Sequence, residues 1–185
     1  MRDIDVVSSV RPSQPGAFMP SDLDEVPEDV VRCELVDGAL VARRPPSPLH
    51  QAVLLELACT LRCVCPEQLQ VLPAPVRFEP AVGLSLLPDV VVCRREDVGD
   101  RRIERPLLAV AVVSQGTREL DTGFRQALYE LSKVPSYWLF DPAKPSLTVR
   151  ELVDGEYAER TVVGDEVFEA TAPFAVRIVP GELVR

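Results

Sequence analysis

The stretch from Pro106 to Pro142 begins Pro-Leu-Leu-Ala-Val-Ala-Val-Val-Ser-Gln-Gly-Thr and ends Tyr-Trp-Leu-Phe-Asp-Pro, with a charged segment in between. Its valine-rich run from Leu107 to Val113 predicts a central strand that is buried on both faces, because no polar residue interrupts it. Apolar residues recur at helical spacing between Glu119 and Lys133, and Val134-Pro135 ends that helix. A second strand resumes at Tyr137. This order predicts a right-handed crossover that places two neighbouring strands in one sheet. The apolar positions of the helix are Leu120, Phe124, Leu128 and Leu131.

Two Asp-Gly pairs predict two-residue hairpin turns, because both turn positions require positive φ. The first predicted hairpin joins Arg32–Val36 to Ala39–Arg43, and the second joins Ser146–Val153 to Glu156–Val163. A helix is predicted to begin at Ser47 or Pro48 and to end before Pro66. Its expected apolar face consists of Val53, Leu54, Leu57, Ala58, Leu61 and Val64.

Shorter elements complete the predicted fold. Ser21 can cap a short helix that ends at Val26, before a proline. Gln68–Phe78 is expected to be an edge strand, because Pro73 and Pro75 interrupt it. Leu86–Cys93 and Phe174–Val179 are two further predicted strands. The chain is therefore expected to mix helices and strands within one core.

The composition bounds the class of protein. With 185 residues, 46% of them hydrophobic, the chain is long enough for one well-buried core and short for two. We expect a single domain over residues 21–185, preceded by a mobile tail over residues 1–20 that has no apolar period. No stretch has the apolar length of a membrane span and the N-terminus lacks a secretory pattern, so we expect a cytoplasmic protein.

Charge and cysteine content exclude some classes of function. The net charge of −9 argues against a protein that coats nucleic acid by bulk attraction, which depends on neutralising phosphates. A local basic cleft stays open, since arginines gather at Arg43-Arg44, Arg94-Arg95, Arg101-Arg102-Arg105 and within 118–125. The five cysteines form no Cys-x-x-Cys and the chain has one histidine, so neither a disulfide framework nor a zinc site is indicated. We expect the cysteines to be small buried residues in a reducing compartment.

Three features could carry chemistry, and each has an ordinary structural explanation. Asp89 follows a proline at the start of a buried strand, where it could simply turn the chain. His50 lies at the start of the first long helix, where its ring could point into solvent. Asp121, Arg125 and Tyr129 follow one another at four-residue spacing, and Asp121 and Arg125 could form a helical ion pair worth roughly 0.3 kcal/mol. Residue spacing by itself favours these structural explanations over catalysis.

Five motifs, taken in order, give the chain a resemblance to a known family. They are Cys33-Glu-Leu-Val-Asp-Gly-Ala-Leu-Val, Pro46-Ser-Pro-Leu-His50, Leu87-Pro-Asp-Val-Val-Val, Ser114-x-x-Thr117 followed by Asp121 and Tyr129, and Val134-Pro-Ser-Tyr-Trp-Leu-Phe-Asp-Pro. From about Pro20 to the C-terminus they resemble the bacterial Uma2 family of restriction endonucleases, within the PD-(D/E)XK nuclease superfamily. The resemblance implies a restriction-endonuclease-like α/β (α+β) fold, with helices flanking a mixed central sheet and β-hairpins at the N- and C-terminal sides. It also implies a homodimer that cleaves DNA with Mg²⁺ in a cleft between the first long helix and the central strands.

The resemblance also assigns site residues. Asp89 matches the metal-binding aspartate of the family. Ala111 occupies the position of the second metal carboxylate, a glutamate in the family, and Arg125 occupies the position of a lysine. Glu34 and His50 match positions near the same cleft. The remaining residues expected in the cleft or on a phosphate are Ser114, Arg118, Asp121 and Tyr129.

The two departures at Ala111 and Arg125 limit how much activity the resemblance implies. Mg²⁺ is usually held by one or two carboxylates together with waters and substrate phosphate. The metal site would keep one carboxylate charge, that of Asp89, with the backbone carbonyl of Val112 as a further ligand. Arg125 can offer donors to a phosphate, but it stays protonated and cannot accept a proton from water.

Three hypotheses about function follow. The preferred one is a nuclease-fold protein with an inactive or strongly impaired site, which persists as a binding or partner module. The second is a working DNA endonuclease in which Glu79 or Glu34 replaces the missing carboxylate. The third, suggested by the acidic balance, is an interaction module that does not bind nucleic acid and has no salt-dependent affinity for DNA.

Overall fold

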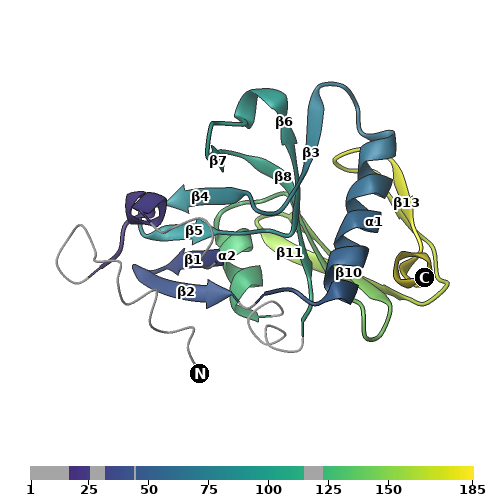
Figure 1. Cartoon of the computed structure of the whole chain (residues 1–185). Helices are drawn as coiled ribbons and strands as arrows, with labels where there is room; N and C mark the ends of the chain where they lie inside the picture. Colours follow the sequence, from purple (N-terminus) through teal and green to yellow (C-terminus); the bar gives the residue numbers. More distant parts are fainter. Residues whose placement is uncertain (1–16, 26–31, 44, 115–122) are drawn as a thin grey trace.

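The computed structural model describes residues 17–25, 32–43, 45–114 and 123–185. A six-stranded sheet with the order β11-β10-β9-β8-β6-β3 forms its centre (Figure 1). β8 and β9 run parallel, and the other neighbouring pairs in this sheet are antiparallel. The strands are β3 (Leu69–Pro73), β6 (Val90–Arg94), β8 (Pro106–Val112), β9 (Ser136–Asp141), β10 (Ser146–Val153) and β11 (Glu156–Val163).

The apolar run that was predicted to be a central strand is β8, between β9 and β6. Because side chains alternate along a strand, its residues supply two separate cores. Leu108, Val110 and Val112 pack in the cluster that contains the first long helix. Ala109, Ala111 and Val113 pack in the cluster that contains Tyr129 of the second helix. The prediction of a strand buried on both faces is confirmed.

The helix α1 (Pro48–Val64) covers one face of the sheet, together with the strands β12 (Phe168–Ala170) and β13 (Val176–Ile178) and the 3₁₀ helix η5 (Pro180–Val184). Ser47 caps α1 by accepting a hydrogen bond from the backbone N–H of His50 at 3.2 Å. The predicted apolar face is buried except for Val64, which is 49% exposed at the last position of the helix.

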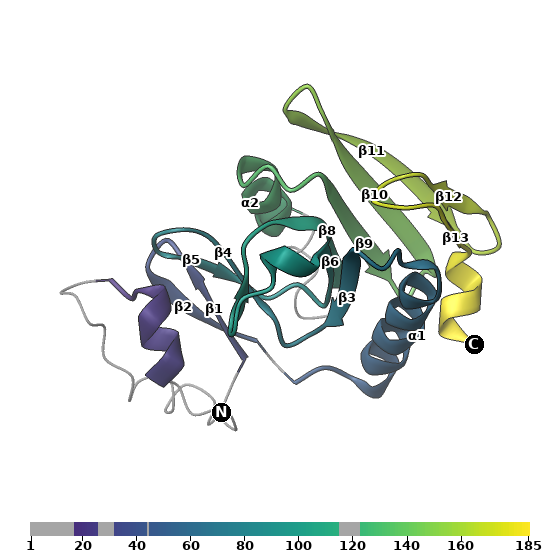
Figure 2. The same ribbon diagram turned by 90° about the horizontal axis from the view of Figure 1, so that it is seen from above.

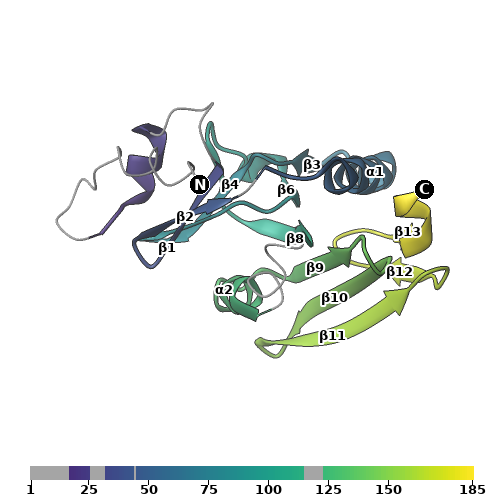
Figure 3. The same ribbon diagram turned by 60° about the horizontal axis from the view of Figure 1, so that its bottom comes forward.

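The helix α2 (Arg125–Leu131) lies on the opposite side of β8 from α1 (Figure 3). Its buried residues are Arg125 and Tyr129, whereas Phe124 is 47% exposed and Leu131 is 75% exposed. Of the predicted apolar positions that the structure describes, Leu128 is partly buried against the core, whereas Phe124 and Leu131 are exposed, so this stripe does not form the fully buried face of the helix. The helix was predicted from Glu119, and residues 115–122 lie outside the described residues.

A second sheet of five strands has the order β2-β1-β5-β4-β7 and extends away from α1 (Figure 2). Its strands are β1 (Arg32–Val36), β2 (Ala39–Arg43), β4 (Arg77–Ala81), β5 (Leu84–Leu86) and β7 (Arg102–Ile103). β4 and β7 run parallel, and the other neighbours are antiparallel. The two β-hairpins are confirmed at the predicted residues, and Asp37 and Asp154 have φ of 49° and 52°.

Two predicted strands are each divided between the two sheets. Gln68–Phe78 becomes the edge strand β3 and, beyond the cis peptide Ala74–Pro75, the strand β4. Leu86–Cys93 becomes the end of β5 and most of β6, with Pro88 between them. Proline cannot donate to a strand ladder, so both breaks fall where the chain moves from one sheet to the other.

Smaller elements and the cysteines complete the comparison. The short N-terminal helix is the 3₁₀ helix η2 (Pro20–Glu25), and η3 (Arg95–Asp97) follows β6. All five cysteines are free thiols, and Cys33 and Cys93 are buried as expected, whereas Cys59 and Cys63 are exposed on α1. In the part of the chain that the structure describes, no helix is long and apolar enough to cross a membrane. Residues 1–16 of the expected tail over residues 1–20 lie outside the described residues.

Candidate functional site

Asp89 lies where the chain passes from the five-stranded sheet into β6. Its backbone N–H donates to the carbonyl of Val110, and its carbonyl accepts from the N–H of Ala74, both at 2.8 Å. Its side chain is 2% exposed, and Oδ2 accepts the backbone N–H of Val112 at 2.8 Å. Asp89 is thus more than a residue that turns the chain, because its carboxylate is held against the end of the central strand.

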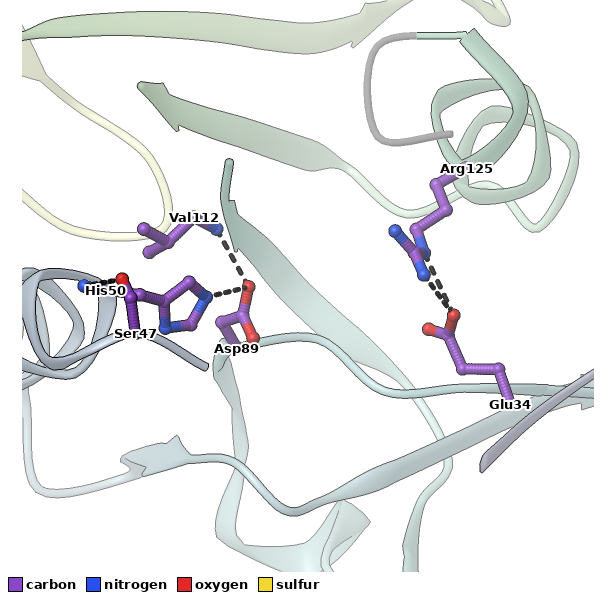
Figure 4. Close-up of polar contacts among 6 residues, drawn as sticks. All are labelled: Glu34, Ser47, His50, Asp89, Val112 and Arg125. Atoms are coloured by element: carbon purple, nitrogen blue, oxygen red, sulfur yellow. Dashed lines mark hydrogen bonds and ion pairs between the residues drawn. The ribbon is translucent and has the colours of Figure 1, made fainter. Parts of the chain in front are cut away.

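His50 faces Asp89 from the first turn of α1 (Figure 4). Its Nε2 lies 3.5 Å from Oδ2 of Asp89, and the residue is 5% exposed. Within the described part of the chain, the buried Nδ1 has no hydrogen-bond partner. The alternative in which the ring points into solvent is wrong, because His50 stands three and four residues before Val53 and Leu54 and shares their buried face. That spacing was the signal in the sequence.

Glu34 and Arg125 form a second buried pair, which Figure 4 shows well apart from His50 and Asp89. Nε of Arg125 donates to Oε2 of Glu34 at 3.0 Å, and Nη2 donates to the same oxygen. Their side chains are 5% and 2% exposed. The other oxygen of Glu34, Oε1, accepts the backbone N–H of Leu87 at 3.0 Å. Glu34 therefore connects α2 to the segment that leads into Asp89.

Ala111 lies on β8 directly after Val110, whose carbonyl accepts the backbone N–H of Asp89. Its side chain lies on the same face of the strand as that of Ala109. It is 4% exposed and packs in a cluster with Phe78, Tyr129 and Tyr137. The ring of Tyr129 stacks on those of Phe78 and Tyr137, with centroids 6.3 and 4.8 Å apart. Tyr129 is thus a core aromatic residue, and position 111, to which the resemblance assigns a second metal carboxylate, is surrounded by apolar and aromatic groups.

Two of the other expected residues, Glu79 and Ser114, lie within the described part of the chain. Glu79, a candidate replacement carboxylate, forms an ion pair with Arg102 at 3.2 Å on the five-stranded sheet. Ser114 follows β8 and is half-buried. Arg118 and Asp121 lie outside the described residues. Reasoning from sequence missed the backbone donors of Leu87 and Val112, because backbone N–H groups leave no trace in residue identity.

The residues present do not fit a magnesium site of two carboxylates. Asp89 has a histidine beside it in place of a second carboxylate, and the carboxylates of Glu34 and Glu79 are bound to arginines. Among the described residues, no group of three or more His, Cys, Asp or Glu side chains is placed to hold a metal ion. Imidazole nitrogen is a poor substitute, since Mg²⁺ prefers oxygen ligands in an octahedral arrangement.

Comparisons with known proteins agree with this fold. The Uma2 family, described as "Putative restriction endonuclease", matches residues 20–179. A crystal structure of "a putative nuclease belonging to DUF820" from Anabaena variabilis is similar, with a TM-score of 0.72 and 15% sequence identity. The similarity covers 90% of this chain and 97% of that one. No curated protein matches the sequence. Because the match to the family extends over most of the chain, this protein belongs to the Uma2 family and has a nuclease fold.

Proposed function

We propose that this chain is a nuclease-fold protein in which Mg²⁺-dependent hydrolysis of DNA is lost or strongly impaired, and which persists as a binding module. The observation that carries the proposal is Ala111, which lies in an apolar and aromatic cluster at the position of the family's second metal carboxylate. A metal in phosphodiester hydrolysis activates the attacking water and offsets charge that develops on the phosphate oxygens. With Asp89 as the one carboxylate that holds the metal, in place of two, both effects are weaker.

The surroundings of Arg125 support the same proposal. A guanidinium remains protonated, so Arg125 cannot accept a proton from the attacking water. Both donors that Arg125 directs at Glu34 lie in a buried pair, and contact with a phosphate would require that pair to open. We therefore place DNA contact, where it occurs, outside this pair.

The proposal includes the partner, assembly and compartment expected from the family. DNA is the proposed partner class, and a homodimer is the proposed assembly. The exposed side chains of Phe124, directly before α2, and of Leu131 at its end offer apolar area for protein contacts. The five free thiols suit a reducing cytoplasm. Light scattering of the purified protein tests the assembly, and salt-dependent binding of duplex DNA tests the partner.

A paired titration and cleavage assay tests the loss of activity. Mg²⁺ and Mn²⁺ are titrated calorimetrically into the wild type and the Asp89→Ala variant, and the same samples are incubated with supercoiled plasmid. We expect no Mg²⁺ binding that depends on Asp89 and no nicking. Nicking that disappears in the Asp89→Ala variant would overturn the proposal, and its further loss in Glu34→Gln or Glu79→Gln would identify the replacement carboxylate. Absence of any salt-dependent DNA affinity would favour the module that does not bind nucleic acid.

A further inference from the structure

The outward face of α1 is largely apolar, although the helix lies at the edge of the molecule (Figure 2). Its opposite face is already buried against the sheet. A surface helix normally directs polar side chains toward solvent, and a helix that is apolar on every side is usually covered on every side. The outward face therefore indicates a partner. Its exposed residues are Leu49, Ala52, Leu55, Glu56, Cys59, Arg62 and Cys63.

We propose that the outward face of α1 is a dimer interface and that its occupant is a second copy of this chain. The inference rests on the proposed function in one respect, the homodimer. It goes beyond it by assigning the surface and the residues that pair across it. The charges of the face favour a second copy, because Glu56 and Arg62 are one acid and one base. A strongly charged partner, such as nucleic acid or an anionic membrane, would find no excess of opposite charge there.

The positions of these residues are self-complementary. Leu55, Cys59 and Cys63 form one row, because residues four apart lie above one another on a helix. Glu56 and Arg62 lie on opposite sides of this row. Such a row is inclined by about 26° to the helix axis, so a two-fold axis along it makes two copies of α1 cross at about 50°, the commonest crossing angle. Each residue of the row then meets its own copy, and Glu56 of each copy meets Arg62 of the other.

The two charged side chains are available for this contact. Both are exposed, and neither forms an ion pair with a residue that the structure describes. They cannot pair within one helix, because neighbours on a helix surface are three or four residues apart and these are six apart. The small side chain of Cys59 at the crossing point lets the two helix axes approach closely. A second copy thus pairs both charges and covers the apolar row, although the chain has a net charge of −9.

The size of the face sets its expected strength. With 17 residues, α1 is about 25 Å long and about 10 Å wide. Its outward face is therefore smaller than the roughly 800 Å² per partner that a standard interface buries. We expect a reversible dimer that forms as the protein is concentrated. In dilute solution the copies separate, and Cys59 and Cys63 are then open to alkylation.

Analytical ultracentrifugation of the full-length protein, over a range of concentrations and with the thiols reduced, tests the interface. Leu55→Asp should raise the Kd of the dimer at least about tenfold, because it places two carboxylates against each other at the crossing. Leu131→Asp is the matched control, since it makes the same change at a leucine that is 75% exposed on α2, and it should leave the Kd unchanged. Circular dichroism checks that both variants are folded.

Charge reversal and cross-linking test the pairing itself. Glu56→Arg and Arg62→Glu should each weaken the dimer, and the double variant Glu56→Arg/Arg62→Glu should restore it. In Cys63→Ser protein, a short bismaleimide should join Cys59 of two copies, and a further Cys59→Ser change should prevent this. A dimer that survives Leu55→Asp, or that Leu131→Asp breaks instead, overturns the inference and leaves the proposed homodimer standing. A protein that is monomeric at every concentration overturns both, whereas the plasmid assay tests the loss of hydrolysis separately.

Discussion

Replacing Arg125 by methionine should be among the most destabilising single changes in the chain. Its side chain and that of Glu34 are 5% and 2% exposed, so the variant leaves a carboxylate in the interior without its guanidinium partner. Breaking a buried ion pair from one side costs roughly 3–5 kcal/mol. In a protein of this size, that loss corresponds to a fall in the midpoint of thermal unfolding of roughly 6–20 °C.

Urea denaturation followed by circular dichroism measures this loss as a change in midpoint at constant slope. Arg102→Met is the matched control, because it removes the same group from a side chain that is 61% exposed and pairs with Glu79 at 3.2 Å. The control should cost less than about 1 kcal/mol. The double variant Glu34→Met/Arg125→Met should recover most of the loss, since neither charge is then left unpaired. The reasoning fails if Arg125→Met costs no more than Arg102→Met.

Three further predictions concern other residues. Ala111→Glu should lower the free energy of unfolding by more than about 2 kcal/mol, because it places a carboxylate in an apolar cluster. Urea midpoints measured with and without Mg²⁺ should show that Mg²⁺ stabilises this variant and does not stabilise the wild type. Alkylation at pH 8, mapped by mass spectrometry, should modify the exposed Cys59 and Cys63 rapidly and Cys93 slowly, because burial raises the pKa of the Cys93 thiol to about 11. Burial by itself would raise the pKa of Asp24, but hydrogen bonds from Arg101 and Arg77 outweigh burial and hold the pKa below its usual 3.8. The ionised carboxylate therefore stabilises the fold above about pH 4, and this contribution disappears as the pH falls further. Asp24→Asn should flatten that part of the curve of unfolding free energy against pH.

The strands and turns of this fold were predictable because their signals are local. The Asp-Gly pairs fix both hairpins at the residues predicted, since Asp37 and Asp154 adopt the positive φ that such turns require. The run of valines predicted β8 because a strand covered on both faces needs no polar alternation. These features depend on neighbouring residues alone.

The orientation of α2 was not predictable in this way. Its sequence carries an apolar stripe and, beside it, a polar stripe with Arg125 and Tyr129, and the polar stripe is the one that is buried. Burial of Arg125 is favourable because Glu34 lies 91 residues earlier in the chain and meets it in the interior. Periodicity within a helix carries no information about a charge that a distant strand supplies. The same limit applies to His50, whose carboxylate neighbour belongs to another element.

Ala111, Asp89 and Glu34 each have a separate set of partners in the fold. Ala111 needs no compensating charge, because its side chain joins an aromatic and apolar cluster on the α2 face of β8. Asp89 remains fixed through the backbone N–H of Val112, a contact that does not depend on the identity of residue 111. Glu34 has its counter-charge in Arg125. Asp89 and Glu34 are thus stabilised by separate partners, so a glutamate introduced at position 111 would add a carboxylate to the apolar cluster without removing either group of the pair that anchors α2.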